Sequence, residues 1–117
     1  MAVTSVDGIL NTALSQLLPT WNSVKEKESS GEAVDTYYVF NYSTFGAGYA
    51  DDDPTGEVYI VQVHLFAPLT ANLTSRIKQT KQVLHEAGFT WPELTNASDE
   101  TGRHIVFECQ YAEGLDL

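Results

Sequence analysis

The sequence predicts an α+β domain in which two helices pack on one face of a small sheet. Two segments, one at the start and one past the middle, have apolar residues at helical spacing. The remaining patterned segments alternate apolar and polar residues and are rich in aromatic and β-branched side chains, as strands are. Their order, α-β-β-α-β(β), indicates a single domain over residues 1–117 with an antiparallel or mixed sheet of three to four strands.

The first helix is predicted over residues 6–18, where apolar side chains recur at three- and four-residue steps. Thr4 or Ser5 can cap its start, and Pro19 ends it because proline cannot continue the hydrogen-bond ladder. Residues 21–35 are polar and charged. We therefore expect a loop there, with room for a short strand around residues 22–25.

Two strands are predicted at residues 36–45 and 57–66, paired as an antiparallel hairpin. Alternation places the large apolar side chains of each strand on one face: Tyr38, Phe40 and Tyr42 in the first, and Tyr59, Val61, Val63 and Leu65 in the second. The connection Gly46–Gly56 is longer than the two to five residues of most hairpin loops. Since extra loop length is often functional, we expect a mobile loop that engages a neighbouring subunit.

The second helix is predicted from Pro68 or Thr70 to about Ala87, with Gly88 at the left-handed position that ends it. Its apolar stripe comprises Leu69, Leu73, Ile77, Thr80, Leu84 and Ala87. Residues 89–92 are interpreted as a short edge strand or turn, and residues 93–102 as a polar loop. The closing strand, at 103–111, turns four side chains inward: Ile105, Phe107, Cys109 and Tyr111.

Composition argues against several classes of function. Sixteen acidic side chains against six basic ones give a formal net charge of −10. Nucleic-acid affinity comes mainly from Lys and Arg that neutralise phosphates, so we expect no direct nucleic-acid binding. No apolar run approaches the ~20 residues that cross a bilayer. The lone Cys109 cannot form an internal disulfide and no leader begins the chain, so we expect a protein made in the cytoplasm, without membrane contact.

No catalytic, cofactor or metal site is predicted. The acidic run Asp51–Asp53 lacks the alternating acids and the distant glutamate of a helix-loop-helix calcium site, so a solvated loop is favoured. His64, His85 and His104 form no local ligand spacing with one another or with Cys109. His64 and His104 can approach each other if their strands pair, and Cys109 alternates onto the core face, where a thiol is inert.

The candidate interface combines the long connection with two tryptophans near prolines at element boundaries. Large aromatic side chains are enriched at interface hot spots, and they also serve as lids on the edge of a core. The core-edge role is the favoured interpretation of both tryptophans. The residues of the candidate interface are Gly46, Gly48, Tyr49, Asp51, Asp52, Asp53, Trp21 and Trp91.

The order of these features resembles the small tail-completion and tail-terminator proteins of long-tailed bacteriophages. The resemblance covers most of the chain and is one of element order and residue class. It is carried by an N-terminal helix Val6–Leu14, an aromatic strand Tyr37–Phe40, a strand Glu57–Phe66, a helix that ends Val83–Phe89, and a closing strand His104–Tyr111.

The resemblance implies a non-enzymatic virion protein that assembles as a ring, typically hexameric, at the head-proximal end of the tail. Such a ring ends the tail tube and joins it to the head. Its partners would be further copies of itself, the tail-tube protein and the head-connector protein. Ring closure requires a heterologous interface, and an acidic lining would not hold passing DNA. The family supplies no catalytic residues to carry over.

Three alternatives remain open. The nearest is another head-tail connector or tail-tube component, because small α+β domains with long hairpin loops recur among them. A small acidic inhibitor or DNA mimic belongs to a different class, but it would need carboxylates spaced along one face, and here they are scattered. A small enzyme is third, since the residues do not converge on a pocket of titratable groups.

Overall fold

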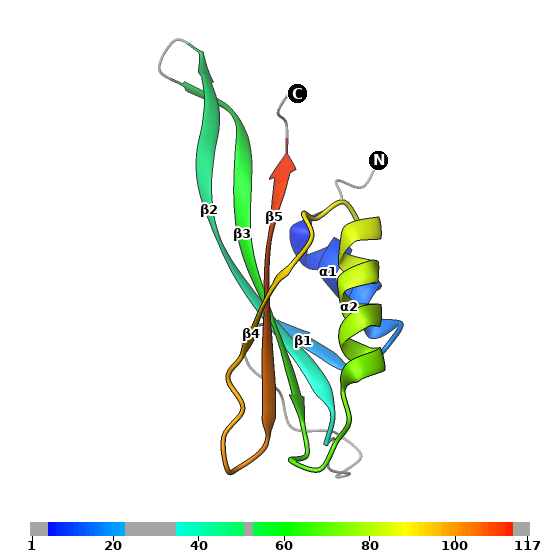
Figure 1. Cartoon of the computed structure of the whole chain (residues 1–117). Coiled ribbons are helices and arrows are strands. Elements are labelled where there is room, and N and C mark those ends of the chain that lie inside the picture. The colour runs from blue at the N-terminus through cyan, green and yellow to red at the C-terminus, as the bar shows by residue number, and fades with distance from the viewer. Residues whose placement is uncertain (1–4, 23–34, 51–52, 114–117) are drawn as a thin grey trace.

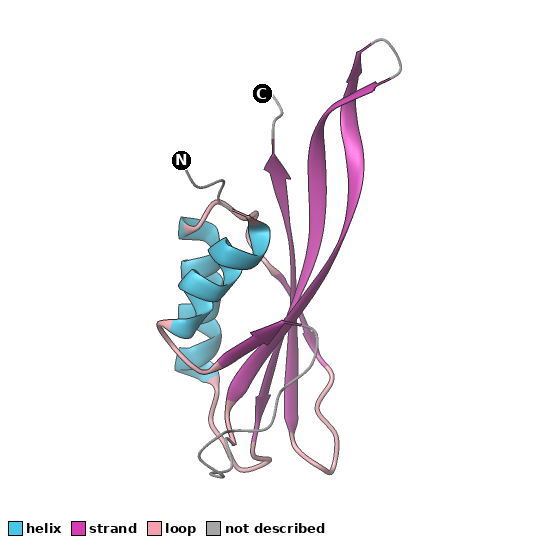
Figure 2. Cartoon of the chain, turned by 180° about the vertical axis from the view of Figure 1, so that it is seen from behind, coloured by secondary structure: helices cyan, strands magenta, loops and turns pink. Residues whose placement is uncertain are grey.

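The computed structural model describes residues 5–22, 35–50 and 53–113. Its elements, in chain order, are α1 (Val6–Ser15), β1 (Thr20–Asn22), β2 (Tyr37–Ala50), β3 (Asp53–Ala67), α2 (Thr74–Glu86), β4 (Glu93–Asn96) and β5 (Arg103–Glu113). They form one five-stranded sheet in the order β1-β2-β3-β5-β4, in which β1 runs parallel to β2 and the other neighbours are antiparallel. Both helices lie on the same side of this sheet (Figures 1 and 2). The predicted α+β class is confirmed.

The predicted count of three to four strands is wrong, because both edge strands lack a strand-like sequence. The short strand expected at 22–25 forms earlier, at β1, directly after Pro19, whose carbonyl accepts a hydrogen bond from the Tyr38 amide at 2.9 Å. β4 lies in the segment expected to be a polar loop, and all four of its side chains are exposed. An edge strand is held by backbone bonds on one side only, so it does not need an apolar alternation. The segment 89–92, by contrast, forms no strand.

The first helix begins as predicted and ends earlier. Ser5 caps it, because its Oγ accepts a hydrogen bond from the Gly8 amide at 3.1 Å. The helix stops at Ser15 instead of Leu18. The amides of Leu17 and Leu18 both donate to the Leu14 carbonyl, at 2.9 and 3.2 Å, so the chain tightens into a turn before Pro19.

The second helix begins later than predicted. A turn closed by the Ala71 amide and the Pro68 carbonyl precedes it, and the Asn72 side chain accepts a hydrogen bond from the Thr74 amide at 3.1 Å. Leu69, expected in the buried stripe, lies in this turn and is 52% exposed. Gly88 ends the helix as predicted, with φ of +106°.

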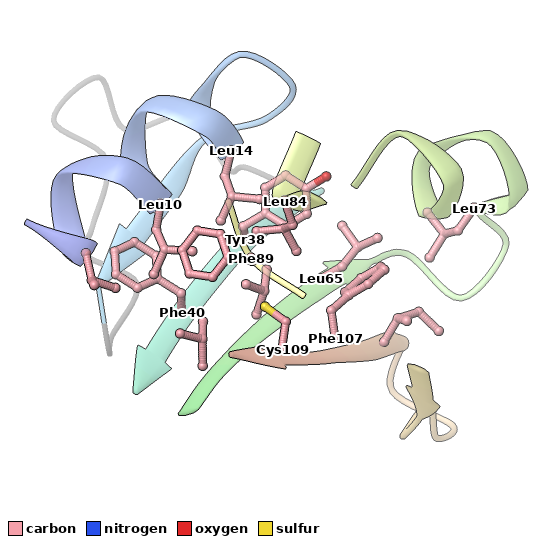
Figure 3. Packing of buried hydrophobic residues seen from close by; sticks show 14 of the residues in the cluster. Leu10, Leu14, Tyr38, Phe40, Leu65, Leu73, Leu84, Phe89, Phe107 and Cys109 are labelled. Carbon is pink, nitrogen blue, oxygen red and sulfur yellow. The ribbon is translucent and has the colours of Figure 1, made fainter. Parts of the chain in front are cut away.

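The core lies between the two helices and the middle of the sheet (Figure 3). The predicted inward faces of β2, β3 and β5 are confirmed. The side chains of these strands that belong to the core cluster are Tyr38, Phe40, Val61, Val63, Leu65, Ala67, Ile105, Phe107 and Cys109, while Val39 is buried on the opposite face. Leu10 and Leu14 of α1 and Leu84 of α2 cover them, and Ile77 packs against the cluster while half-buried.

The central hairpin is much longer than predicted, and this changes the shape of the molecule. β2 continues to Ala50 and β3 starts at Asp53, with these two residues paired, so only residues 51–52, outside the described part, join them. The expected eleven-residue loop Gly46–Gly56 is therefore wrong. Because glycine, aspartate and proline are depleted in strands, the local sequence indicated a loop where cross-strand pairing continues.

The ends of β2 and β3 project beyond the rest of the sheet as a two-stranded ribbon, called here the arm (residues 46–50 and 53–57; Figures 1 and 2). β5 pairs with β3 up to Glu113, opposite Glu57, so among the described residues it flanks β3 as far as the base of the arm. The arm makes the molecule elongated, at 53 × 29 × 22 Å.

Candidate interaction site

The sheet is longer than the helices that cover it, so part of its helix-bearing face is left open at the base of the arm. Three tyrosines from adjacent strands meet there. The ring centroids of Tyr42 and Tyr59 are 5.6 Å apart, and those of Tyr59 and Tyr111 are 6.4 Å apart. Glu57 and Glu113 follow on the same face, opposite each other in the register of β3 and β5. These five residues are called here the tyrosine patch.

The tyrosine patch is anchored to the core at one end and exposed at the other. Tyr111 lies against Phe89, with ring centroids 5.2 Å apart. It also sits over Gly88, where an added Cβ would approach the Tyr111 ring to 3.3 Å. Tyr42, at the opposite end, is 36% exposed. The patch therefore offers aromatic surface whose position is held by the fold.

Negative charge gathers around these tyrosines. A hydrogen bond with Asp7, in the first turn of α1, is the largest cause that raises the pKa of Tyr42 to about 12. Partial desolvation, followed by the charges of Glu113 and Glu57, raises the pKa of Tyr59. Glu57 also accepts a 2.6 Å hydrogen bond from the Thr44 hydroxyl. The carboxyl groups of Asp7, Glu57 and Glu113 make this an acidic surface.

The cationic side chains lie elsewhere. Of the four Lys and Arg residues in the described part of the chain, Arg76, Lys78 and Lys81 belong to α2, and Arg103 begins β5. Lys78 is exposed and Lys81 is half-buried, and helical spacing places both on one flank of α2, beside the buried stripe that contains Thr80 and Leu84. The two lysines therefore lie at the side of α2 and not on the face that packs against the sheet.

An exposed aromatic pair continues this cationic surface. His85 lies one turn beyond Lys81 and stacks on Trp91, with ring centroids 4.4 Å apart and planes 6° from parallel. Trp91 is 55% exposed. Lys78, Lys81, His85 and Trp91 are called here the lysine face. It combines positive charge with a large aromatic anchor, a combination common at interface hot spots.

The opposite face of the sheet, free of helices, carries a row of rings across four strands. Trp21 of β1 meets Tyr37 of β2 edge-on at 5.7 Å, Tyr37 stacks on Phe66 of β3 at 5.1 Å, and Phe66 stacks on His104 of β5 at 4.3 Å. Each ring thus contacts the ring on the next strand. Trp21 is half-buried in this row, consistent with a structural role.

His64 and His104 form a pair that extends this row of rings, as expected if their strands lie side by side. His64 Nδ1 and His104 Nε2 are 2.8 Å apart. The Asn41 side chain donates to His64 Nε2 at 3.2 Å, which leaves His64 Nδ1 to donate to His104. Burial, followed by the neighbouring His104, lowers the pKa of His64. Within residues 5–22, 35–50 and 53–113 no three His, Cys, Asp or Glu side chains are grouped to hold a metal ion.

The remaining candidate for chemistry is the thiol of Cys109. It is buried, and desolvation, followed by the charge of Glu108, raises its pKa to about 12.

Neither described helix is long and apolar enough to cross a membrane.

The predicted interface residues do not form one surface. Gly46, Gly48 and Tyr49 lie in β2 and Asp53 opens β3, so these four belong to the arm, whereas Asp51 and Asp52 lie outside the described residues. Trp21 is in an edge strand on the helix-free face, and Trp91 stands beside α2 across the sheet. The tyrosine patch and the two lysines were missed. The sequence carried one usable signal: a strand advances about 3.3 Å per residue and a helix about 1.5 Å, so two short helices cannot cover such strands.

Comparison with known proteins gives information about the fold alone. No protein-family model matches this chain, and neither does any curated protein. Four chains of solved structures match. One of them is similar over 97% of this chain and 90% of its own length, with a TM-score of 0.58 and 13% sequence identity. A likeness at that identity shows a shared fold alone.

Proposed function

We propose that this protein is a non-enzymatic structural subunit that assembles with copies of itself into a ring at the head-proximal end of a phage tail. There it ends the tail tube and joins it to the head, with the tail-tube and head-connector proteins as its further partners. The observation that carries the proposal is the arm, which projects beyond the core and, among residues 5–22, 35–50 and 53–113, is held by the pairing of β2 with β3.

A two-stranded ribbon on its own is marginally stable in water. The free edge of a strand also presents backbone donors and acceptors that pair readily with another chain. β1 covers the outer edge of β2 only at residues 38–40, so from Asn41 onward that edge has no strand partner among the described residues. Such a feature is a liability in a monomer, whereas a subunit of an assembly uses it as a contact.

The order of the helices and strands supports the specific role proposed for the protein in the virion. The arrangement of helices, hairpin and closing strand resembles tail-terminator proteins, which implies the ring and its place in the virion. An acidic composition suits a ring through which DNA passes, because like charges do not hold the DNA. The lack of a convergent pocket of nucleophile, base and metal ligands among the described residues favours an assembly role over catalysis.

The test removes the arm without disturbing the rest of the hairpin. Gly46 and Glu57 are paired, so residues 47–56 can be replaced by an Asn-Gly turn that keeps the register of the remaining strands. We expect a thermal melt close to that of the natural chain and loss of the oligomers seen by light scattering coupled to size-exclusion chromatography. A natural chain that stays monomeric at all concentrations, or a shortened chain that assembles equally well, would refute the proposal.

The position of the protein in the phage particle distinguishes a tail terminator from a tail-tube component. In electron micrographs of labelled particles, a terminator occupies only the junction between head and tail, whereas a tube component is distributed along the tail. Label along the whole tail would refute the terminator role while leaving self-assembly intact.

A further inference from the structure

We propose that neighbouring copies contact each other through the tyrosine patch of one copy and the lysine face of the next. This inference rests on the proposed self-assembly and names the two surfaces that meet. Its occupant is a second copy of this chain, because the chain itself carries two exposed surfaces that complement each other in charge and in aromatic content.

Charge complementarity is the first argument. The chain has a net charge of −10, so two copies repel each other in most orientations. The tyrosine patch is anionic through Glu57 and Glu113, with Asp7 beside it. Lys78 and Lys81 are neighbours on one helical surface and carry much of the described positive charge. Facing the patch toward these lysines replaces repulsion with attraction.

Geometry is the second argument. Within one chain the two surfaces belong to different elements, since the patch is part of the sheet at the base of the arm and the lysines lie on a flank of α2. The proposed contact therefore joins two copies. Because the two surfaces differ, the contact is heterologous, and repeating it generates a ring if the rotation closes.

The aromatic side chains are the third argument. Tyr42 is 36% exposed at one surface and Trp91 is 55% exposed at the other. Large exposed aromatic residues next to charged groups are the type of residue on which interface energy concentrates. The stacking of Trp91 on His85 fixes its orientation before association, which lowers the entropy lost on binding.

The experiment reverses the charges on each surface in turn. One variant carries Lys78→Glu and Lys81→Glu, and a second carries Glu57→Lys and Glu113→Lys. Each alone should associate about tenfold or more weakly than the natural chain in sedimentation velocity runs at low salt. The first variant is more negative than the natural chain and the second less negative. Weakening of both therefore cannot follow from net charge.

Mixing the two variants in equal amounts is the decisive measurement. In an alternating assembly every contact again joins opposite charges, so association should return. The matched control is Asp35→Lys with Glu100→Lys, because these exposed acidic side chains precede β2 and β5, at the end of the sheet away from the arm, and belong to neither surface. This control should assemble as the natural chain does, and unchanged melting curves should show that each variant folds.

The outcomes separate this inference from the proposed function. A natural chain that does not assemble refutes both. Assembly of the natural chain with no loss in either variant, or with no recovery in the mixture, overturns the contact and leaves self-assembly standing. A control variant that loses assembly as strongly as Glu57→Lys with Glu113→Lys also overturns the contact, because the effect would then not belong to the tyrosine patch.

Discussion

Tyr38 Oη and Thr80 Oγ1 lie 2.5 Å apart in the interior and join the sheet to α2 by a buried hydrogen bond. Thr80 Oγ1 also donates to the Arg76 carbonyl at 2.7 Å, so its single proton is used and the Tyr38 hydroxyl is the donor to Thr80. Desolvation is the largest cause that raises the pKa of Tyr38 and keeps it protonated as this donor. The pair explains how a threonine takes a place in the apolar stripe of the helix.

Replacing Thr80 by valine should reduce the free energy of unfolding by about 1–3 kcal/mol, because the buried Tyr38 hydroxyl then loses its acceptor. Urea unfolding of the single variant measures this loss. Adding Tyr38→Phe to Thr80→Val should recover part of it, since no unpaired hydroxyl remains. A Thr80→Val protein as stable as the natural chain would show that the hydroxyl finds another partner.

Leu84→Ala should reduce the free energy of unfolding by about 2–5 kcal/mol, because Leu84 is fully buried between α2 and the sheet (Figure 3). The matched control is Leu69→Ala, since Leu69 was predicted in the same stripe yet is 52% exposed. The control should change stability by less than about 0.5 kcal/mol. Thermal melts with equal shifts in both variants would contradict the observed start of α2.

The histidine pair should make the fold less stable as the solution becomes acidic. The pKa of His64 is lowered from 6.5 in the folded state, so the unfolded chain takes up its proton first as pH falls. Stability linked to this group is therefore complete above pH 6.5 and is lost as pH decreases below it. Comparing unfolding at pH 7.5 and 5.5 should show a smaller drop for His64→Gln than for the natural chain. An equal drop in the His64→Gln variant and in the natural chain would contradict this prediction.

Cys109 should resist alkylation in the folded protein. Its thiol is buried and its pKa is raised to about 12, so at pH 8 very little reactive thiolate is present. Iodoacetamide should modify it rapidly in denaturing urea and slowly, at the rate of opening of the core, without urea. Rapid reaction of the folded protein would contradict the burial of this strand and reopen the question of an essential nucleophile.

Faces were easier to predict than the ends of elements. Alternation along β2, β3 and β5 correctly placed Tyr38, Val61 and Phe107 in the core, because a strand buried on one side must keep its apolar residues in a period of two. The same register predicted that His64 and His104 could approach each other, and their ring nitrogens are 2.8 Å apart. Leu69 was misplaced because its spacing fits the apolar stripe of the helix. The helix begins only at Thr74, and Leu69 lies in the turn that precedes it.

The sequence by itself determined the class of the fold, the inward faces of three strands and the caps at Ser5 and Gly88, because periodicity, side-chain capping and backbone freedom are local properties. Only the tertiary structure decided the two edge strands and the arm. Glycine, aspartate and proline between residues 46 and 56 indicate a loop locally, yet the pairing of β2 with β3 continues through Ala50 and Asp53 and extends a ladder already aligned by the buried parts of these strands. The tyrosine patch likewise depends on the tertiary structure, because three strands bring its rings together where the sheet extends beyond the two helices. The relative length of sheet and helices is a property of the assembled elements and not of any one segment.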